Sequence, residues 1–588
     1  MKHLLKGGRR KMAAVMAVAL VASLSQVAPS SAAPAAKKSG GEITVGVFNS
    51  LLSSCFSPNA SNSALGIMRA VYEGFFEQQE GGKVVPYLAA AVTPSADFKT
   101  WDLKLRPNVK FHDGTPLDAT AAITNIQATR GLYAAGAIAR LGQAGGLAAA
   151  AHTLSSGIPF AANIKDVKAV AADVIRYELW NPQVDFDESS YASGRQFIRA
   201  LSDLTNPSQC ATAGKGTGPF MFQKLTPTEV VLVRNPNYWR KDKDGVQLPY
   251  LDKITFKYVN QPSQRVKGLQ SGTLDAAGFS SAGEAKHLVN VKSVKGATLL
   301  MSPPDYYAMS MFNHAIEPFN NLDARLAVAY AFDTQTFYEQ RNCFKGTCFG
   351  EVPSSIVGAK NISYLKKGFI TFDLAKAKEH AAKYKAATGK DLTFSQPSDT
   401  SAEAQASSKL FQQMMKKAGI TMNISTEDTA TITAKAFPSP TSGQVNTYQL
   451  YPTTLFEGTG TAFTLPFLQS NSFTAPNNLT LRGLGALAPL FGAFGRAINP
   501  ARFADPEQDK LVWAAQYSPD KASRPAKLKA LTEYLQKTAA VLPAPSIQYG
   551  FAFNSKVKGF DTFTLASGGR GKAMTNAGAA WVGVYLEK

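Results

Sequence analysis

The sequence predicts a mixed α/β protein with more than one lobe, and three observations lead to this class. The chain has 588 residues, of which 45% are hydrophobic and 18% are charged, values typical of a folded chain with a large core. Short strand patterns and amphipathic helix patterns are mixed along its whole length. Their order shows neither the regular alternation of a barrel or a single doubly wound sheet nor an internal repeat of about 20–50 residues.

Strands are predicted where apolar and polar residues alternate, because successive side chains of a strand point to opposite faces. Residues 43–47 show this alternation. In residues 101–106, Trp101, Leu103 and Leu105 alternate with charged residues, which predicts a strand with one solvent-facing side. Further strands are predicted at 174–179, 230–233, 254–259 and 420–424.

Helices are predicted where apolar residues recur every three or four positions. The first covers residues 64–76, with apolar positions such as Leu65, Met68 and Val71. A second, at 116–129, follows the Asp113–Gly114 turn, and a glycine closes the one at 265–272. Others are predicted at 323–333, 373–385, 403–418 and 528–540.

The first 32 residues read as a signal peptide. Five positive charges precede an apolar run at 12–24, and small residues offer a cleavage site before Ala33. A run of this length is short for a membrane span, which takes about 20 residues. An uncleaved anchor is the alternative, and the choice between general and twin-arginine export stays open. Residues 33–41 are a flexible linker, and the mature protein is expected in the periplasm or outside the cell, associated with the envelope.

The positive charge of the chain does not indicate nucleic-acid binding. The formal net charge is +20, and the five positive residues at the N-terminus account for part of it. The rest is spread thinly, without the clustered basic stripe and aromatic platforms that nucleic-acid binding requires. We therefore expect a solvated basic surface and no nucleic-acid partner.

The four cysteines suit an oxidising compartment. Cys343 and Cys348 close a short loop containing Gly346, which favours a local disulfide and leaves Cys55 and Cys210 for a second one. Three connectivities are possible, so the pairing stays open. A metal site is the alternative, but the six histidines lack metal-ligand spacing, and no metal or other cofactor is predicted.

No motif in the chain calls for catalysis. The glycine-rich segment 213–219 lacks the spacing of a phosphate loop and reads as a turn that enters a strand. There is no Gly-x-Ser-x-Gly elbow. Asp185, Asp187 and Glu188 form the closest acidic cluster, which we interpret as a solvated loop. The sequence thus names no catalytic residue.

A set of characteristic motifs follows in a fixed order along the chain. They are Val71-Tyr-Glu-Gly-Phe-Phe76, Gly82-Lys-Val-Val-Pro-Tyr-Leu-Ala89, Lys99-Thr-Trp-Asp-Leu-Lys-Leu-Arg106, Pro107-Asn-Val-Lys-Phe-His-Asp-Gly-Thr-Pro116, Gly216-Thr-Gly-Pro-Phe220, Arg234-Asn-Pro-Asn-Tyr-Trp239, Tyr250-Leu-Asp-Lys-Ile254 and Leu269-Gln-Ser-Gly-Thr-Leu-Asp275. Together they resemble the peptide/nickel class of extracytoplasmic solute-binding proteins that serve ABC importers. The resemblance runs from about residue 42 to 563 and is weakest between 429 and 500.

Several of these landmark residues have structural roles on physical grounds. His112 lies in a turn before Pro116, where a structural role is favoured over a ligand role. Tyr238 and Trp239 end another turn and are predicted to anchor the core rather than stack on a ligand. The motifs therefore identify the fold better than the ligand.

The resemblance implies a two-lobed clamshell, like that of periplasmic binding proteins, with an inserted third subdomain. Lobe I would comprise residues 42–76, 207–305 and 551–588. Subdomain II would be residues 77–206, and lobe III would be residues 306–550. Two crossing segments, near 305 and 550, would form the hinge.

The resemblance also implies which residues face a ligand. In relatives, the segment after the first strand pairs with an extended ligand, and by position its members here are Asn59, Ser61, Asn62 and Ser63. The third lobe and the crossover contribute Tyr307, Asn313, Tyr451, Phe456 and Glu457. The acidic residues that hold a peptide amine in relatives are missing around 448–460, where Glu457 is the acid that remains.

The implied function is that of a monomeric receptor that captures a peptide-like or other small solute and delivers it to an ABC permease, without covalent chemistry. An exported hydrolase on a similar scaffold is the alternative from another class. A nickel- or chelate-binding member is the second alternative, for which His314 is the histidine at the crossover.

Overall fold

The computed structural model describes most of the chain after the predicted signal peptide and linker. It describes residues 39–48, 62–129, 163–191, 194–205, 213–304, 306–354, 357, 361, 363–438, 444–457, 465–470, 499–575 and 578–587, with backbone alone at 62–64, 430 and 454–457. The predicted signal peptide, most of the linker, and Cys55 and Cys210 lie outside the described residues. From residue 38 onward the chain forms one compact unit.

A seven-stranded mixed sheet gathers strands from distant parts of the sequence. Its order is β12 (Thr298–Met301), β20 (Tyr549–Phe553), β11 (Ala276–Ser280), β1 (Glu42–Val47), β10 (Lys253–Tyr258), β9 (Glu229–Arg234) and β8 (Phe220–Leu225). β1 runs parallel to both β10 and β11, so it is central. The strands predicted at 43–47, 230–233 and 254–259 are confirmed, as is the strand after the glycine-rich turn.

Helix α1 (Asn62–Val71) packs near this sheet and is shorter than predicted. The predicted helix ran to residue 76, but the chain turns after Val71 and enters β2 (Phe76–Gln78), which pairs with β3 (Val84–Pro86). Tyr72, Phe75 and Phe76 are buried in spite of this turn. The apolar pattern therefore continues because the segment is buried on several sides, and helical periodicity is not its cause.

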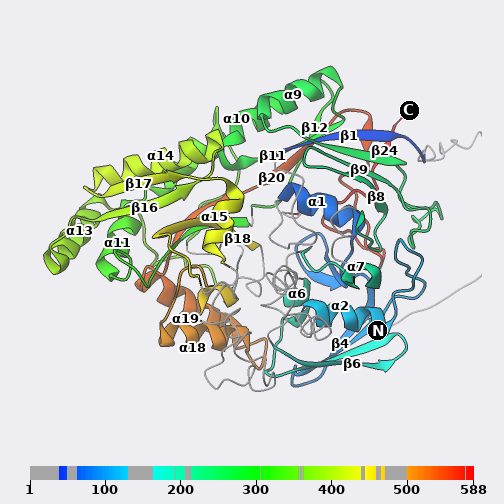
Figure 1. Ribbon diagram of the computed structural model, residues 1–588, viewed down its shortest axis with the longest axis horizontal. Helices are drawn as coiled ribbons and strands as arrows, with labels where there is room; N and C mark the ends of the chain where they lie inside the picture. The colour runs from blue at the N-terminus through cyan, green and yellow to red at the C-terminus, as the bar shows by residue number, and fades with distance from the viewer. Residues whose placement is uncertain are drawn as a thin grey trace, which may run out of the picture. The chain divides into compact units, whose positions relative to one another are not determined.

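A four-stranded antiparallel sheet forms the second region. It has the order β4 (Ala89–Pro94), β5 (Thr100–Leu105), β7 (Val174–Leu179) and β6 (Ile164–Ala171), with α2 (Ala119–Thr129) packed against it (Figure 1). Trp101, Leu103 and Leu105 point into its core, which confirms the alternation seen in the sequence. The short helices α6 (Phe186–Tyr191) and α7 (Leu201–Thr205) follow.

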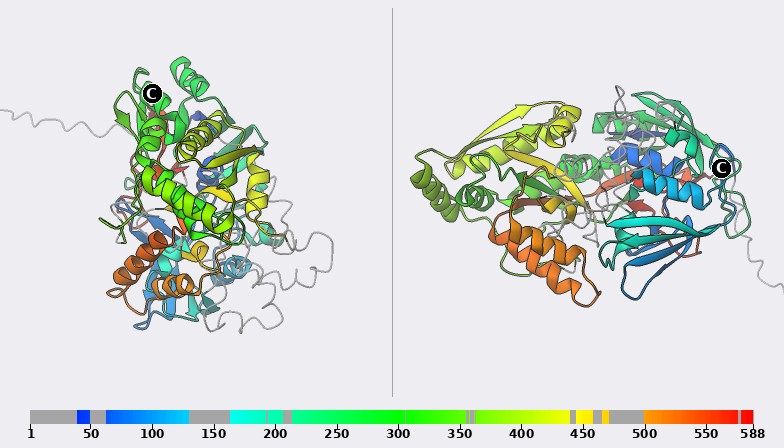
Figure 2. Two further views of the ribbon diagram at one scale, coloured as in Figure 1. Left: turned by 90° about the vertical axis from the view of Figure 1, so that its left-hand side faces the viewer. Right: turned by 60° about the horizontal axis from the view of Figure 1, so that its bottom comes forward.

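The third region is built around β13 (Tyr306–Phe312), which lies between β18 (Leu450–Glu457) and β19 (Val541–Ile547). The parallel pair β16 (Thr393–Ser398) and β17 (Thr421–Thr426) lies among helices, and α18 and α19 lie side by side (Figure 2). The helices are α11 (Leu322–Ala331), α12 (Thr334–Asn342), α13 (Leu374–Thr388), α14 (Ala402–Lys417), α15 (Thr429–Ala436), η2 (Leu465–Leu468), α18 (Pro506–Gln516) and α19 (Arg524–Lys537).

The remaining elements are short or flank the large sheet. They are α9 (Pro262–Ser271), α10 (Ser281–Val291), β14 (Cys343–Phe344), β15 (Thr347–Cys348), β21 (Val557–Lys558), β22 (Met574–Thr575), β23 (Gly578–Ala579) and β24 (Tyr585–Leu586). A disulfide joins Cys343 to Cys348 across the β14–β15 hairpin, as the sequence favoured. Among the helices that the structure describes, none has the length and apolar character needed to cross a membrane.

Two short connections join the seven-stranded sheet to the three-stranded sheet. β12 leads into β13, and β19 leads into β20 through the single residue Gln548. The connections are bonded to each other, because Gln548 Nε2 donates to Ser302 O at 2.6 Å and Tyr549 N donates to Ser302 Oγ at 3.0 Å. They lie where the sequence places the crossings, and the three predicted domain ranges stay predictions.

Candidate functional site

The main candidate site is a cavity of about 610 Å³ beside these two connections. Its walls come from β13, β18 and β19, from the ends of β11 and β20, and from β16, α12, α14 and α15. Arg195 of the second region also lines it. The size falls within the range of about 300–1,000 Å³ that is usual for small-molecule sites.

Aromatic side chains form one wall of this cavity. The rings of Phe48 and Tyr549 are stacked with centroids 5.9 Å apart, and Tyr306 lies 5.7 Å from Tyr549. On the side of the third region, Phe437 and Tyr451 form an edge-to-face pair with centroids 5.8 Å apart. Such rings offer flat apolar surface to a ligand.

The carboxyl end of β16 reaches the cavity from the third region, and α15, which follows the parallel partner strand β17, also lines it. Ligands often bind at this end of parallel strands. α14 and α15 follow the two strands, and their first turns are capped by Ser401 and Asp428. Gln396, near the end of β16, is 5% exposed, and its Oε1 has no hydrogen-bond partner within the described part of the chain. A buried amide in this state favours a polar ligand group.

Charged groups in the wall are largely engaged with the protein. Arg341 Nη2 donates to the backbone oxygen of Glu403 at 2.8 Å, and burial lowers the pKa of Arg341. Glu284 accepts from the fully buried Arg265 at 2.6 Å. Gly283, with φ of +88°, makes room for Arg341, since a Cβ at this position would lie 2.2 Å from Arg341 Nη2. The cavity therefore combines aromatic surface with a few fixed polar groups.

The predicted site residues that are described in full have three different positions. Tyr451 lines the cavity. Tyr307 points the other way along β13 and donates to Glu351, while the adjacent Tyr306 lines the cavity instead. Asn313 is buried beyond the cavity and donates to Asn446 O and Tyr448 O, both at 3.0 Å. Strand alternation explains why neighbours differ.

The other predicted site residues lie wholly or partly outside the described residues. Asn59 and Ser61 are outside them, and Asn62 and Ser63 begin α1 with side chains outside them. The side chains of Phe456 and Glu457 are also outside, although their backbones pair with Tyr307 and Tyr306 in the β13–β18 ladder. Their role at a ligand stays a prediction.

Sequence reasoning missed Gln396, Arg341 and Tyr549 as lining residues. Tyr549 lies at the second crossing, which the sequence placed near residue 550, so its position was a usable signal. Gln396 carries no such signal, because it reads as one polar residue at the end of an unpredicted strand. Arg341 reads as a surface residue of a polar helix.

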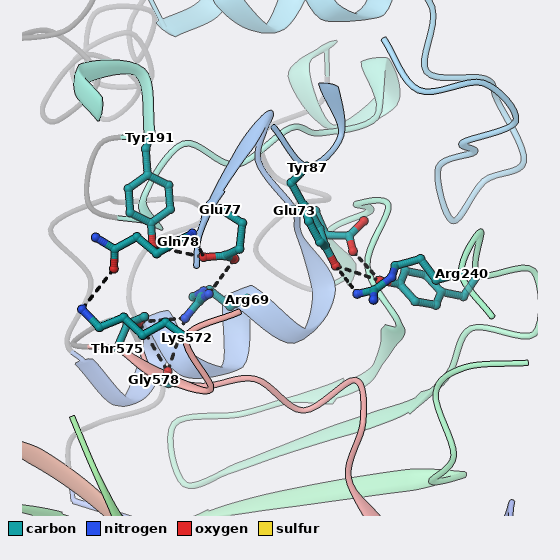
Figure 3. A network of polar contacts seen from close by, with 11 residues as sticks. Arg69, Glu73, Glu77, Gln78, Tyr87, Tyr191, Arg240, Lys572, Thr575 and Gly578 are labelled. Carbon is teal, nitrogen blue, oxygen red and sulfur yellow. Dashed lines mark hydrogen bonds and ion pairs between the residues drawn. The ribbon is translucent and has the colours of Figure 1, made fainter. Parts of the chain in front are cut away.

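A second polar cluster surrounds the buried Glu73, where the first and second regions meet (Figure 3). Glu73 accepts from Tyr238 OH at 2.6 Å, Trp239 Nε1 at 2.9 Å and Thr217 Oγ1 at 2.9 Å. Burial raises the pKa of Glu73, and these donors and Arg240 oppose the rise. The protein itself satisfies this carboxylate, so the cluster is scaffold. The prediction that Tyr238 and Trp239 anchor the core is confirmed.

A neighbouring network ties α1 to the last strands of the chain (Figure 3). Arg69 pairs with Glu77 at 2.6 Å and donates to Thr575 Oγ1 at 2.7 Å, while Tyr191 donates to Glu77 at 3.2 Å. The adjacent cavity measures about 40 Å³, too small for a solute. This network also serves the scaffold.

His112 and the glycine-rich turn have structural roles, as predicted. His112 Nδ1 accepts from Gly216 N at 3.2 Å, which leaves Nε2 to donate to Gly218 O at 2.9 Å. Burial lowers the pKa of His112 to about 4, so the ring is neutral. A Cβ at Gly216 would lie 2.2 Å from Val71 O. The glycines thus permit close packing against α1.

The acidic cluster at 185–188 corrects a prediction. It is no solvated loop, because α6 begins at Phe186 and Asp185 is 6% exposed. Asp185 pairs with Arg524, the first residue of α19, 339 residues further along the chain. Burial, followed by the charge of Asp185, raises the pKa of Glu188 to about 7. The residues line a second cavity of about 250 Å³.

Comparison with known proteins identifies the family. The model of "Bacterial extracellular solute-binding proteins, family 5 Middle" matches residues 83–472. The structure of the binding protein AgaA from A. tumefaciens R10, in complex with agropinic acid, aligns with a TM-score of 0.72 at 19% identity. That alignment covers 93% of this chain and 99% of AgaA. It shows the two-lobed periplasmic-binding-protein fold that the sequence predicted.

Two curated relatives match part of the chain. The nickel-binding periplasmic protein of Escherichia coli K12 is 28% identical over 47% of this chain and 48% of the relative. The glutathione-binding protein GsiB of Shigella flexneri is 24% identical over 55% of this chain and 62% of the relative. The matches thus span about half to three fifths of the relatives' length.

Proposed function

Because the chain belongs to family 5 of the bacterial extracellular solute-binding proteins, we propose that it captures a peptide-like or other small solute and delivers it to an ABC permease. The solute binds in the 610 Å³ cavity, and this cavity is the observation that carries the proposal. Its walls come from both sides of the two crossing connections. A solute held there contacts both halves and so favours their closed arrangement.

The proposed solute contacts follow from the cavity wall. Tyr306, Tyr451 and Tyr549 supply apolar faces, and Gln396 Oε1 supplies an acceptor that no donor among the described residues satisfies. The relatives' names support a small polar solute, since one binds glutathione and the AgaA structure holds agropinic acid. A closed state gains several kcal/mol from such contacts if the protein is mostly open without solute, about 5 for a nearly complete shift.

Nickel binding receives less support from this cavity. Among the described residues that line it there is no histidine. His314 lies elsewhere: its Nε2 bonds Ala540 O at 2.9 Å, and burial lowers its pKa to about 3. An anionic chelate that carries the metal would need Arg195 or Arg341. The family is one of binding proteins, which favours this function over the exported hydrolase.

The export route and the surroundings of the protein are part of the proposal. The signal-peptide pattern at residues 1–32 and the family's extracellular description support export to the periplasm or cell exterior. The Cys343–Cys348 disulfide suits that oxidising compartment. We propose that the protein acts there as a monomer.

A thermal-shift panel on the protein from residue 33 onward tests the function. The panel comprises di- to nonapeptides, glutathione, agropinic acid, oligosaccharides and nickel–histidine chelates. We expect one class to raise the melting temperature in a concentration-dependent way. The Gln396→Leu and Tyr451→Ala variants should lose that response. Lack of stabilisation by every class, together with hydrolytic turnover, would contradict the proposal.

A further inference from the structure

An ion pair joins the second and third regions at a distance from the main cavity's wall. Asp185 precedes α6 of the second region, and Arg524 begins α19 of the third. The side chains are 7% and 14% exposed. Neither residue lines the 610 Å³ cavity. The contact therefore lies outside the proposed solute site.

Each partner is held rigidly by its own hydrophobic core. Phe186, next to Asp185, packs edge-to-face on Tyr177 with centroids 5.0 Å apart, inside the core of the four-stranded sheet. Leu528 and Leu531 of α19 pack in a different core, with Met309 of β13. The ion pair thus joins two segments whose hydrophobic side chains pack in different clusters of this compact unit.

A second charged contact supports the first. Lys521 lies over the ring of Phe98 at 5.9 Å, again between the third and second regions. The 250 Å³ cavity beside the ion pair is lined by charged and apolar side chains from the two sides. The charged ones are Lys83, Asp185, Asp187, Glu188, Lys521 and Arg524, and the apolar ones are Val84, Val184, Pro525 and Leu528. An interface with these charged groups and this much space can hold water, so its surfaces separate at lower cost than wholly apolar ones.

We propose that Asp185 and Arg524 are positioning residues that hold the second region against the third, and so raise the affinity for solute without touching it. This inference rests on the proposed function. The reason is thermodynamic: a contact made in the closed arrangement and lost on opening shifts the equilibrium toward the form that binds. Apparent affinity follows the fraction of protein in that form.

Small-angle scattering of the solute-free protein tests the proposal without any ligand. We call the Asp185–Arg524 ion pair the latch. The variants are Arg524→Gln, Asp185→Asn and the double variant. Lys529→Gln is the matched control, because it removes the same charge from α19 at an exposed position. We expect a larger radius of gyration for both single variants, no further increase for the double variant, and an unchanged value for the control.

Hydrogen exchange gives a local readout. In Arg524→Gln, amides of residues 185–191 and 517–528 should exchange about tenfold faster, the change that corresponds to about 1.4 kcal/mol. Amides of β1 and β10 should be unaffected, because the large sheet does not take part. A merely structural role would instead lower protection and the urea midpoint throughout the third region.

The outcomes separate this inference from the proposed function. Equal radii and equal exchange rates in wild type and Arg524→Gln would overturn the latch, even if a solute binds. A larger radius in Arg524→Gln would support it, even if every class in the thermal-shift panel fails. An expansion that also appears in Lys529→Gln would reflect charge in general and would overturn the specific pair.

Discussion

Two buried carboxylates, Glu73 and Asp185, are held by the protein in contrasting ways. Glu73 accepts three hydrogen bonds from Thr217, Tyr238 and Trp239, all within one tightly packed junction. Asp185 pairs with Arg524 between two regions whose hydrophobic side chains pack in different clusters, beside a cavity large enough for water.

The contrast teaches what to expect when each acid is removed. Removing Glu73 would take one acceptor from three neutral donors in the interior, so the loss is in the free energy of folding. Without Asp185, Arg524 would become solvated as the second and third regions separate. The free energy that is lost is therefore that of closure. Removal of a buried acid thus lowers the stability of the fold where its partners lie in the same packed junction. It weakens closure where its partner lies in a different region.

The largest expected effect is on stability at the first carboxylate. Glu73→Ala should lower the free energy of unfolding by about 3 kcal/mol, because it takes an acceptor from buried donors. Urea denaturation followed by circular dichroism measures this. Glu80→Ala, at an exposed position, is the control and should stay within about 0.5 kcal/mol of wild type. A loss in Glu73→Ala no larger than in the control would contradict the contrast.

We expect an intermediate effect of pH on the closed-to-open equilibrium, through Glu188, which lies near Asp185. The pKa of Glu188 is raised to about 7 by burial and by Asp185, and Lys521 and Arg524 oppose the rise. The pKa of Asp187 is raised as well. If opening exposes Glu188, its pKa returns to the ordinary range, so the closed form binds more protons. Closure is then favoured at low pH and weakened as the pH rises through about 7.

Scattering at two pH values measures this effect. Between pH 6 and pH 8 we expect the closed-to-open ratio to fall about tenfold, or about 1.4 kcal/mol. The radius of gyration should therefore increase with pH. Glu188→Gln should abolish the change and stay compact at both values. A pH response that persists in Glu188→Gln would assign it to another group.

The smallest expected effect is on the free energy of unfolding at the main cavity, where a substitution should stabilise the protein and not destabilise it. Gln396→Leu removes a buried amide whose Oε1 has no partner in the described part of the chain, so the free energy of unfolding should rise by up to about 1 kcal/mol. Solute-induced stabilisation should decrease at the same time. Urea denaturation with and without the best solute from the panel measures both. A variant that loses stability would mean that the amide is satisfied in the free protein.

The sequence allowed prediction of the elements whose burial differs between two faces. β1, β5, β7, β9 and β10 were found by alternation. β13 was missed because both of its faces are largely buried and its sequence is almost uniformly apolar. β19 was missed because Pro543 and Pro545 disguise a strand that pairs along one side. Local pattern is informative only where one side meets solvent.

The site was predictable in location and much less so in composition. The crossings near 305 and 550 and Tyr451 could be derived from family resemblance. Arg341 and Gln396 come from separate elements that only the tertiary fold brings to one cavity. Asp185 was misread for the same reason, since its partner Arg524 is 339 residues away.

The bonding between the two crossing connections limits how the halves can move. Ser302 N donates to Tyr549 O at 2.7 Å, and Gln548 Nε2 donates to Ser302 O, so the links are fastened side by side. Two connections that are hydrogen-bonded to each other bend as one unit. We therefore expect any movement of the two sheets relative to each other to be a rotation about a single axis, with sliding and independent twisting suppressed.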